Sequence, residues 1–287
     1  MLLSTVADQH IVAATVATIS FQPTDSHGDP ADPLSAVTVT VSSSNGTAIA
    51  TDQATVGATD DPRTFALTPA QTATIDRLTA TWTADGVVIG TTVHAIIGRP
   101  IITSAEYKTR EPKRVADFVA ADFRWALADT FGMILKRANR SFVPMLAVEV
   151  TESVGRSSLG LTFPDIESVL WATDDNGTTI DVSTARPSST QARVEFPSKC
   201  WPSGRVTVAY VHGMKAVPGE LVGAVAKRIS SLTTSGHGMT PAASLMPAGI
   251  GAGGGFRPMA GYGRSITGDV DVDAAINANK WEQIGIA

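Results

Sequence analysis

The 287-residue chain has one cysteine, few charged residues and few aromatic residues. Because Cys200 has no second cysteine to pair with, an internal disulfide is excluded, and a lone thiol is typical of a protein kept in a reducing cytoplasm. The first residues carry no basic leader and place Asp8 and His10 before the first apolar run, so a secretion signal is not expected. No apolar run reaches the roughly 18 residues that a membrane span needs. We therefore expect a soluble protein.

Charge is scarce and slightly acidic. Charged residues make up 17% of the chain, and the formal net charge is −5. Tight nonspecific binding to DNA needs clustered Lys and Arg, so only weak contact with DNA is expected. Small residues dominate instead, which favours strand-rich packing, and the length is sufficient for two domains with their own cores.

Signals of catalysis and of metal binding are missing. The five histidines are scattered without ligand spacing, and one cysteine cannot complete a zinc motif. The glycines of residues 249–255 include a G-x-G-x-x-G, but Pro247 and Pro258 flank it where a strand and a helix are required, which favours a linker. His212 follows a strand, and we expect its ring to bond a turn carbonyl. The sequence predicts no enzyme, no cofactor and no metal.

Residues 1–98 predict an all-β sandwich. Short alternating segments are separated by turns, among them an Asn-Gly pair at residue 45 and an Asp-Gly pair at residue 85. Trp82 lies on the same strand face as Leu78 and Ala80 and is the predicted anchor of the core. Without a cysteine pair, an immunoglobulin-like assignment depends on the strand count alone.

Residues 99–235 predict a second domain of helices and a small antiparallel sheet. Apolar residues recur at helical spacing from about Pro112 to Asn139, as one helix or two in series, roughly 40 Å long at 1.5 Å per residue. Such a helix exceeds what the following strands cover, so part of it is expected to pack on a neighbouring subunit. Asp122 and Trp125 are the candidate interface residues. The alternative for Asp122 is a partly exposed position at the edge of the apolar stripe, or an ion pair with an arginine of the same chain.

The segment Trp201 to Leu232 combines a strand, a turn and a helix. Gly213 ends the alternating strand. Pro218 is suited to the first turn of a helix, because the backbone N–H that proline lacks would have no hydrogen-bond partner in that turn. The predicted core of this domain consists of Phe118, Phe123, Leu127, Phe142, Tyr210, Leu221 and Val225.

Residues 236–287 predict an extended arm. The segment up to Gly268 has too few periodic apolar residues to fold by itself, and Asp271 or Asp273 can cap a short terminal helix. The segment contains five spaced apolar residues, which a solvated tail does not need, so we expect it to dock on a partner. A disordered tail is the alternative. The predicted anchors for docking to a portal or a neighbour are Ile266, Val270, Val272, Ile276 and Trp281.

Four motifs, in order, resemble the head-to-tail adaptor proteins of long-tailed phages, also called connector or head-completion proteins. Residues 136–150 are similar to that family's helix end, R-x-F-V-P turn and first strand, and residues 159–182 to its central hairpin. The segment from Trp201 to Leu232 resembles its strand, His-Gly turn and helix, and residues 265–281 its C-terminal tail. The resemblance covers roughly residues 100–287. The N-terminal sandwich and the sequence TGDVDVD depart from the family pattern.

The resemblance implies a structural virion protein that forms a ring, a dodecamer, at the portal vertex and extends the DNA channel. The implied partners are further copies of the chain, the portal protein, a stopper or tail-terminator protein and, through residues 1–98, the major capsid protein. DNA would make only transient contact. The implied location is the neck of a virion assembled in the host cytoplasm.

Two other classes of function were weighed against this resemblance. One is a phage surface binding module or adhesin that uses the N-terminal sandwich, with the rest as a trimerising stem; it should show exposed aromatic clusters. The other is a hydrolase on a β-rich scaffold, for which the sequence supplies no convergent nucleophile and base.

Overall fold

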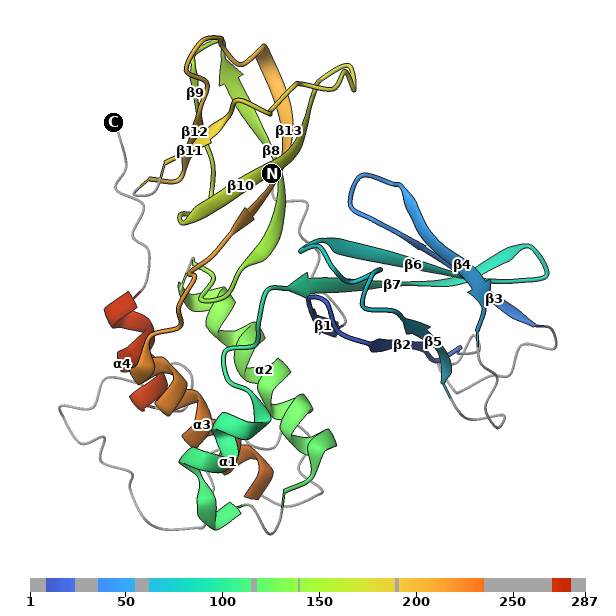
Figure 1. The fold of residues 1–287 in the computed structure, drawn as a ribbon, viewed down its shortest axis with the longest axis vertical. Helices are drawn as coiled ribbons and strands as arrows, with labels where there is room; N and C mark the ends of the chain where they lie inside the picture. Colours follow the sequence, from blue (N-terminus) through green and yellow to red (C-terminus); the bar gives the residue numbers. More distant parts are fainter. Residues whose placement is uncertain are drawn as a thin grey trace, which may run out of the picture. The chain divides into compact units, whose positions relative to one another are not determined.

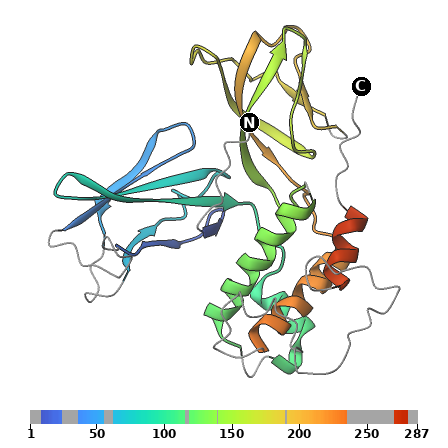
Figure 2. The same ribbon diagram turned by 180° about the vertical axis from the view of Figure 1, so that it is seen from behind.

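The computed structural model describes residues 9–23, 36–54, 62–114, 118–138, 140–188, 191–234 and 270–279 (Figures 1 and 2). The chain forms two compact units. The β unit consists of Met1–Pro100 and Arg140–Ala216, and the helical unit of Ile101–Asn139 and Val217–Ala287. Each unit is therefore built from two separate stretches of the chain. The predicted domains, 1–98, 99–235 and 236–287, are instead continuous stretches, and that division stays a prediction. The predicted α+β class with a strand-rich N-terminal region is confirmed.

The N-terminal part of the β unit is a five-stranded sheet and a separate strand pair. The sheet order is β1 (Gln9–Val12), β7 (Val87–Ile97), β6 (Arg77–Ala84), β3 (Val37–Ser42) and β4 (Ala48–Gln53). The pair is β2 (Ala17–Phe21) and β5 (Arg63–Leu67). Strands β3 and β6 alternate between buried and less buried residues, as expected where one sheet face covers a core. Trp82 is fully buried in that core. The immunoglobulin-like assignment stays a prediction.

The remaining strands of the β unit form two small antiparallel sheets. In one, β13 (Ser203–His212) lies between β10 (Ile166–Asp174) and β8 (Met145–Val154). In the other, β12 (Arg193–Glu195) lies between β11 (Arg186–Pro187) and β9 (Ser158–Gly160). Their buried apolar residues form one cluster, which contains Ala147, Leu159, Leu161, Ile166, Ala172, Val194, Phe196, Trp201, Val206, Val208 and Tyr210.

The helical unit contains α1 (Ser104–Arg110), η1 (Pro112–Arg114), α2 (Ala120–Ala138), α3 (Gly219–Thr234) and α4 (Val270–Asn279). Helix α3 contacts α1, α2 and α4, and α2 also contacts α4. Both ribbon views show α3 and α4 side by side (Figures 1 and 2). Because α1, α2 and α4 pack on α3, its residues Leu221, Val225 and Ile229 are fully buried.

The helix predicted from Pro112 is shorter in the structure. Pro112 begins only a single 3-10 turn, and α2 spans 19 residues, or roughly 28 Å at 1.5 Å per residue. Helix α1 was not predicted, although a capping box marks its start: Thr103 accepts from the Glu106 N–H and the Glu106 carboxylate accepts from the Thr103 N–H. Such a box satisfies two backbone donors that a helix end otherwise leaves without partners.

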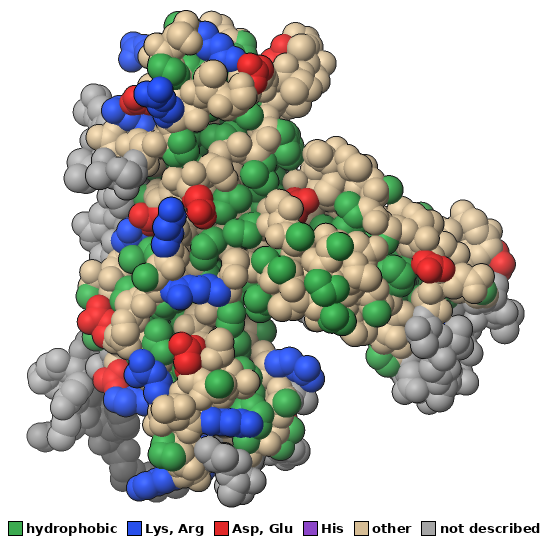
Figure 3. Space-filling model, in the orientation of Figure 1, with side chains coloured by type: hydrophobic (Ala, Val, Ile, Leu, Met, Phe, Trp, Pro, Cys, Tyr) green, Lys and Arg blue, Asp and Glu red, His purple; other side chains and the backbone are tan. Residues whose placement is uncertain are grey.

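Charged side chains of both signs are interspersed over the face seen in Figure 3, so the acidic net charge is not gathered into one area there. Within the described ranges, no group of three or more His, Cys, Asp or Glu residues is arranged to hold a metal ion. None of the described helices combines the length and the apolar character that crossing a bilayer requires.

Candidate assembly surface

The exposed large apolar side chains of the helical unit lie at the start of α2 and just before it. Among its described residues, the large apolar side chains left exposed are Val119 and Trp125, at 47% and 50%. Asp122 lies one helical turn before Trp125, so the two share a face of α2. An indole half in water is unfavourable in a monomer, since burying apolar surface contributes about 25 cal/mol per Å².

A groove lies beside these residues. It has a volume of about 240 Å³ and is lined by Tyr107, Arg114, Phe118, Val119, Asp122, Phe123 and Thr233. These residues come from α1, η1, the approach to α2, α2 itself and the end of α3. The groove therefore combines one cation, one carboxylate and an aromatic wall within the helical unit. We call the groove together with Val119 and Trp125 the α2 surface.

Three aromatic rings form the wall of the groove. The ring centroids of Tyr107 and Phe123 lie 5.3 Å apart, and Phe118 lies 5.7 Å from Phe123 and 6.2 Å from Tyr107. The tilted geometry is the arrangement that aromatic pairs prefer. Lys108 places its Nζ 4.1 Å from the centroid of Phe118. The wall is held by aromatic packing and a cation–π contact, so it does not depend on a partner for its shape.

The predicted core residues occupy both units. Phe142 and Tyr210 are fully buried in the β unit, and Phe123, Leu221 and Val225 are buried in the helical unit. Phe118 and Leu127 are only half-buried, and Phe118 lines the groove. The expectation that part of the long helix packs on a neighbouring subunit stays a prediction. Most of the stripe is covered within the chain, because Phe123, Ala126, Phe131, Ile134 and Ala138 are buried.

The predicted docking anchors are also placed differently from the expectation. Val272 and Ile276 are 0% and 3% exposed, and their helix α4 packs on α3 and α2 of the same chain. Lys227 pairs with Asp271 at 2.6 Å, and the Asn279 amide donates to Glu220 at 2.9 Å. In this structure the two side chains fill the core of the helical unit, so they are not displayed for a partner.

The other predicted anchors are only partly described. Val270 begins α4, but its side chain is not described. Ile266 and Trp281 lie outside the described residues. Docking by those residues therefore stays a prediction.

A buried polar group that sequence reasoning missed is Glu149 on β8. Its carboxylate accepts the Tyr210 hydroxyl at 3.0 Å and the Thr162 N–H at 3.0 and 3.2 Å. Burial raises the pKa of Glu149, and the hydrogen bonds from Thr162 and Tyr210 oppose that shift. The signal in the sequence is strand alternation: Glu149 is in phase with the buried Ala147, which predicts that it points inward.

The ring of His212 stacks on Phe163, with centroids 4.4 Å apart and planes inclined by 9°. Its Nδ1 has no hydrogen-bond partner among the described residues, so the predicted bond to a turn carbonyl is not found for that atom. Complete burial lowers the pKa of His212 to about 3, although the nearby Asp165 carboxylate opposes the shift. The imidazole is therefore neutral near pH 7 and acts as a packing group.

No protein-family model and no curated protein sequence matches the chain. Three solved structures are similar to it. The neck of an empty GTA particle computed with C6 symmetry has a TM-score of 0.42 and 16% identity, over 65% of this chain and 93% of that chain. The neck of a native GTA particle computed with C12 symmetry has a TM-score of 0.40 and 15% identity, over 65% of this chain and 96% of that chain. The virion of a native gene transfer agent particle has a TM-score of 0.43 and 17% identity, over 65% of this chain and 93% of that chain. With TM-scores below 0.5, these similarities carry no argument about this chain.

Proposed function

We propose that the chain is a structural protein of a phage-type neck, in which identical copies form a ring that joins the head to the tail. The proposal depends on the ordered motifs of residues 100–287 and on one structural observation. That observation is the α2 surface, where Trp125 and Val119 remain exposed beside an aromatic-walled groove. The printed descriptions of the three similar structures agree with this proposal but add no independent support.

The α2 surface is suited to heterologous contact between copies. A ring requires one patch of a subunit to meet a different patch of the next, so that the rotation closes. Tryptophan is enriched in such contacts because a large rigid ring buries much area with little loss of conformational entropy. Asp122 and Arg114 supply one charge of each sign within the same groove. Opposite charges at the edge of an apolar contact set its orientation more than its strength.

The remaining parts of the proposal come from the family resemblance. The ring, a dodecamer, contacts the portal on one side and a stopper or tail-terminator protein on the other, and it extends the DNA channel. Residues 1–98 contact the major capsid protein, and DNA makes only transient contact. A surface adhesin is less well supported, because Trp82, the aromatic residue that such a role would display, is fully buried.

The test is the oligomeric state of the full chain and of Trp125→Glu, measured by native mass spectrometry and by sedimentation from low to high protein concentration. We expect the parent to form closed rings as its concentration rises, and Trp125→Glu to remain monomeric. Val154→Glu is the matched control, since Val154 is 73% exposed at the end of β8 in the other unit. It makes the same change in charge and should assemble like the parent.

Three results would argue against the proposal. A parent chain that stays monomeric at every concentration and does not assemble with a purified portal ring would contradict ring formation. A trimer would favour the stem of an adhesin. Equal assembly of the Trp125→Glu and parent chains would remove the α2 surface from the contact. Melting curves of both variants should match the parent, because exposed substitutions change stability by about 0.5 kcal/mol or less.

A further inference from the structure

Within the helical unit, the groove of the α2 surface and the end of α4 lie at opposite ends of α3. Thr233, in the last turn of α3, lines the groove. The Asn279 amide, at the end of α4, donates to the carboxylate of Glu220 in the first turn of α3 at 2.9 Å. From Glu220 to Thr233, α3 covers roughly 20 Å at 1.5 Å per residue. Both ribbon views show α4 running beside α3 (Figures 1 and 2).

Trp281 follows closely after α4 and lies outside the described residues. It is two residues beyond Asn279, where α4 ends, and two residues span at most about 7 Å even when fully extended. With α4 packed on α3 as described, the Trp281 side chain therefore falls short of the groove in its own chain. A Trp281 that fills the groove has to come from another copy.

The other tryptophans are less suited to fill the groove of a neighbour. The chain has five, of which Trp82 and Trp201 are buried in the β unit and Trp171 is half-buried there. Trp125 is exposed, but it lies beside the groove on the same side of α2. A copy that inserted Trp125 into a partner would receive the partner's Trp125 in return, and such a contact closes as a twofold dimer. Trp281 can instead join two different patches, as a ring requires.

The groove matches the chemistry of Trp281 and its two neighbours in the sequence. Its wall of three rings offers the tilted contacts that aromatic side chains prefer, and a guanidinium such as that of Arg114 stacks well on an indole. Lys280 and Glu282 flank Trp281 with one charge of each sign, as Asp122 and Arg114 do in the groove. A volume of about 240 Å³ is below the range of drug-sized pockets and suits a single large side chain.

We infer that the groove of one copy receives Trp281 of the next copy, so that residues 280–287 are the segment that a ring neighbour contributes. The inference rests on the proposed function and names the partner of the α2 surface. The two patches lie at opposite ends of the helical unit, so each copy gives its segment at one end and accepts a segment at the other. Because the aromatic wall is formed within one copy, the receiving side loses little conformational entropy on binding.

The test is binding of a labelled peptide with the sequence of residues 280–287 to the full-length Trp281→Ala chain, followed by fluorescence anisotropy. In that variant no neighbour supplies a tryptophan, so the groove is open to the peptide. We expect saturable binding below about 1 mM, because linked segments reach effective concentrations of that order. A peptide with alanine in place of the tryptophan should bind at least about tenfold more weakly, since a buried tryptophan is a typical binding hot spot.

A matched pair of valine variants locates the peptide. Val119→Glu, added to the Trp281→Ala chain, places a carboxylate in the lining of the groove and should weaken peptide binding about tenfold, because a charge in an apolar contact is costly. Val154→Glu makes the same change in the β unit and should bind the peptide like the Trp281→Ala chain. Both valines are exposed, so neither change should impair folding.

Absence of saturable binding, or equal binding to the two valine variants, would overturn the inference. Native mass spectrometry separates this failure from a failure of the ring. Rings of Trp281→Ala that form at the same concentration as parent rings would overturn the docking of Trp281 and leave the ring proposal standing. Peptide binding by a chain that never forms rings would support the groove contact and contradict the ring. A dimer that persists in Trp281→Ala and is lost in Trp125→Glu would make Trp125 the occupant.

Discussion

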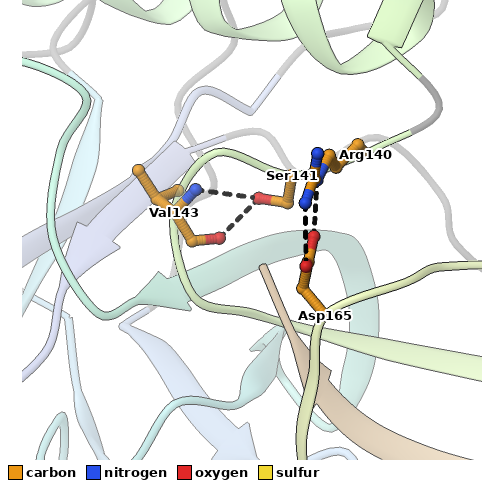
Figure 4. Close-up of polar contacts among 4 residues, drawn as sticks. All are labelled: Arg140, Ser141, Val143 and Asp165. Atoms are coloured by element: carbon orange, nitrogen blue, oxygen red, sulfur yellow. Dashed lines mark hydrogen bonds and ion pairs between the residues drawn. The ribbon is translucent and has the colours of Figure 1, made fainter. Parts of the chain in front are cut away.

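The β unit and the helical unit differ in which polar and aromatic side chains they bury. In the β unit, buried polar groups such as Glu149 and Ser141 have partners within the same unit, and Figure 4 shows those of Ser141. In the helical unit, the cores of α2, α3 and α4 are closed, yet Trp125 and Val119 stay exposed at one end of α2. Exposed valines also occur in the β unit, such as Val154 at 73%, so the difference lies in the kind of side chain: the helical unit leaves a tryptophan exposed beside a groove, whereas the β unit buries Trp82 and Trp201. Four substitutions test this division, from the largest expected effect to the smallest.

The largest effect is expected for Gly213→Ala, which places a methyl group against the Val143 backbone within the β unit. A Cβ would meet the Val143 carbonyl at 2.1 Å, at φ +122°, so both the clash and the backbone conformation are unfavourable. We expect the free energy of unfolding to fall by about 4 kcal/mol in denaturant titrations. Gly204→Ala is the matched control, because Gly204 has φ +107° and nothing within 4 Å of its added Cβ. An equal loss for both variants would mean that the contact with Val143 contributes nothing.

The next effect tests whether α4 belongs to the core of the helical unit. Ile276 is 3% exposed, and Ile276→Ala should lower the free energy of unfolding by about 3 kcal/mol, because it removes buried methyl groups and leaves a cavity. Asn277→Ala, exposed on the same helix, should change stability little. Chemical denaturation checks both. An Ile276→Ala chain with the same free energy of unfolding as the parent would show that α4 does not pack at this position in solution. Docking of Ile276 to a partner would then be the better interpretation.

A third prediction concerns pH and the buried His212. Its folded-state pKa, about 3, lies below the usual value near 6.5. The unfolded chain therefore takes up a proton that the folded chain resists, and stability falls as the pH falls from 6.5 toward 3. The slope from this group alone is about 1.4 kcal/mol per pH unit.

His212→Phe keeps a ring to stack on Phe163 and should flatten this slope while changing stability little at pH 7.5. The difference between the two chains isolates the histidine, because Glu149 titrates in both. Glu149 acts in the opposite direction, since its pKa is raised by burial. Parallel curves of melting temperature against pH for the two chains would contradict the assignment.

The smallest effect is expected for Tyr210→Phe, which removes one hydroxyl from the β unit. That hydroxyl donates to Glu149 at 3.0 Å and accepts the Phe163 N–H at 3.3 Å. We expect a loss of about 1.5 kcal/mol. The pKa of Glu149 should rise further, because a bond that favours the carboxylate is lost. Carbon NMR of the glutamate carboxyl follows that titration, and Tyr107→Phe in the helical unit, which leaves Glu149 untouched, is the control for it. An unchanged pKa would show that the hydroxyl does not bond the carboxylate in solution.

Elements with strong local signals were predictable from the sequence. Alternation and turn residues predicted the strands around Trp82 and the strand that ends before Gly213, because both depend on neighbours a few residues away. The sequence predicted one helix or two in series from about Pro112, and the structure has a 3-10 turn at Pro112–Arg114 and α2 from Ala120. The capping box at Thr103 was a readable signal that went unused.

The candidate site was only half predictable. The exposure of Trp125 was expected because its ring lies off the buried stripe of the helix, and the structure leaves it 50% exposed. Its interface role stays a prediction. The groove beside Trp125 was not expected, since it is assembled from α1, α2 and α3, which are far apart in the sequence. The docking role predicted for Val272 and Ile276 stays a prediction, although the structure buries both side chains within the helical unit. Spaced apolar residues show that a segment packs on something, but they do not say whether that surface belongs to the same chain.

By itself, the sequence determined the class of the fold, the positions of most strands, and which face of each strand and helix is apolar, because these depend on period and on local backbone preference. Only the tertiary structure decided which apolar faces meet one another, and that Gly98, Asp165 and Met214 are bonded to residues 140–144. Those outcomes depend on contacts between residues 25 to 75 positions apart, and no local pattern encodes which distant segments become neighbours.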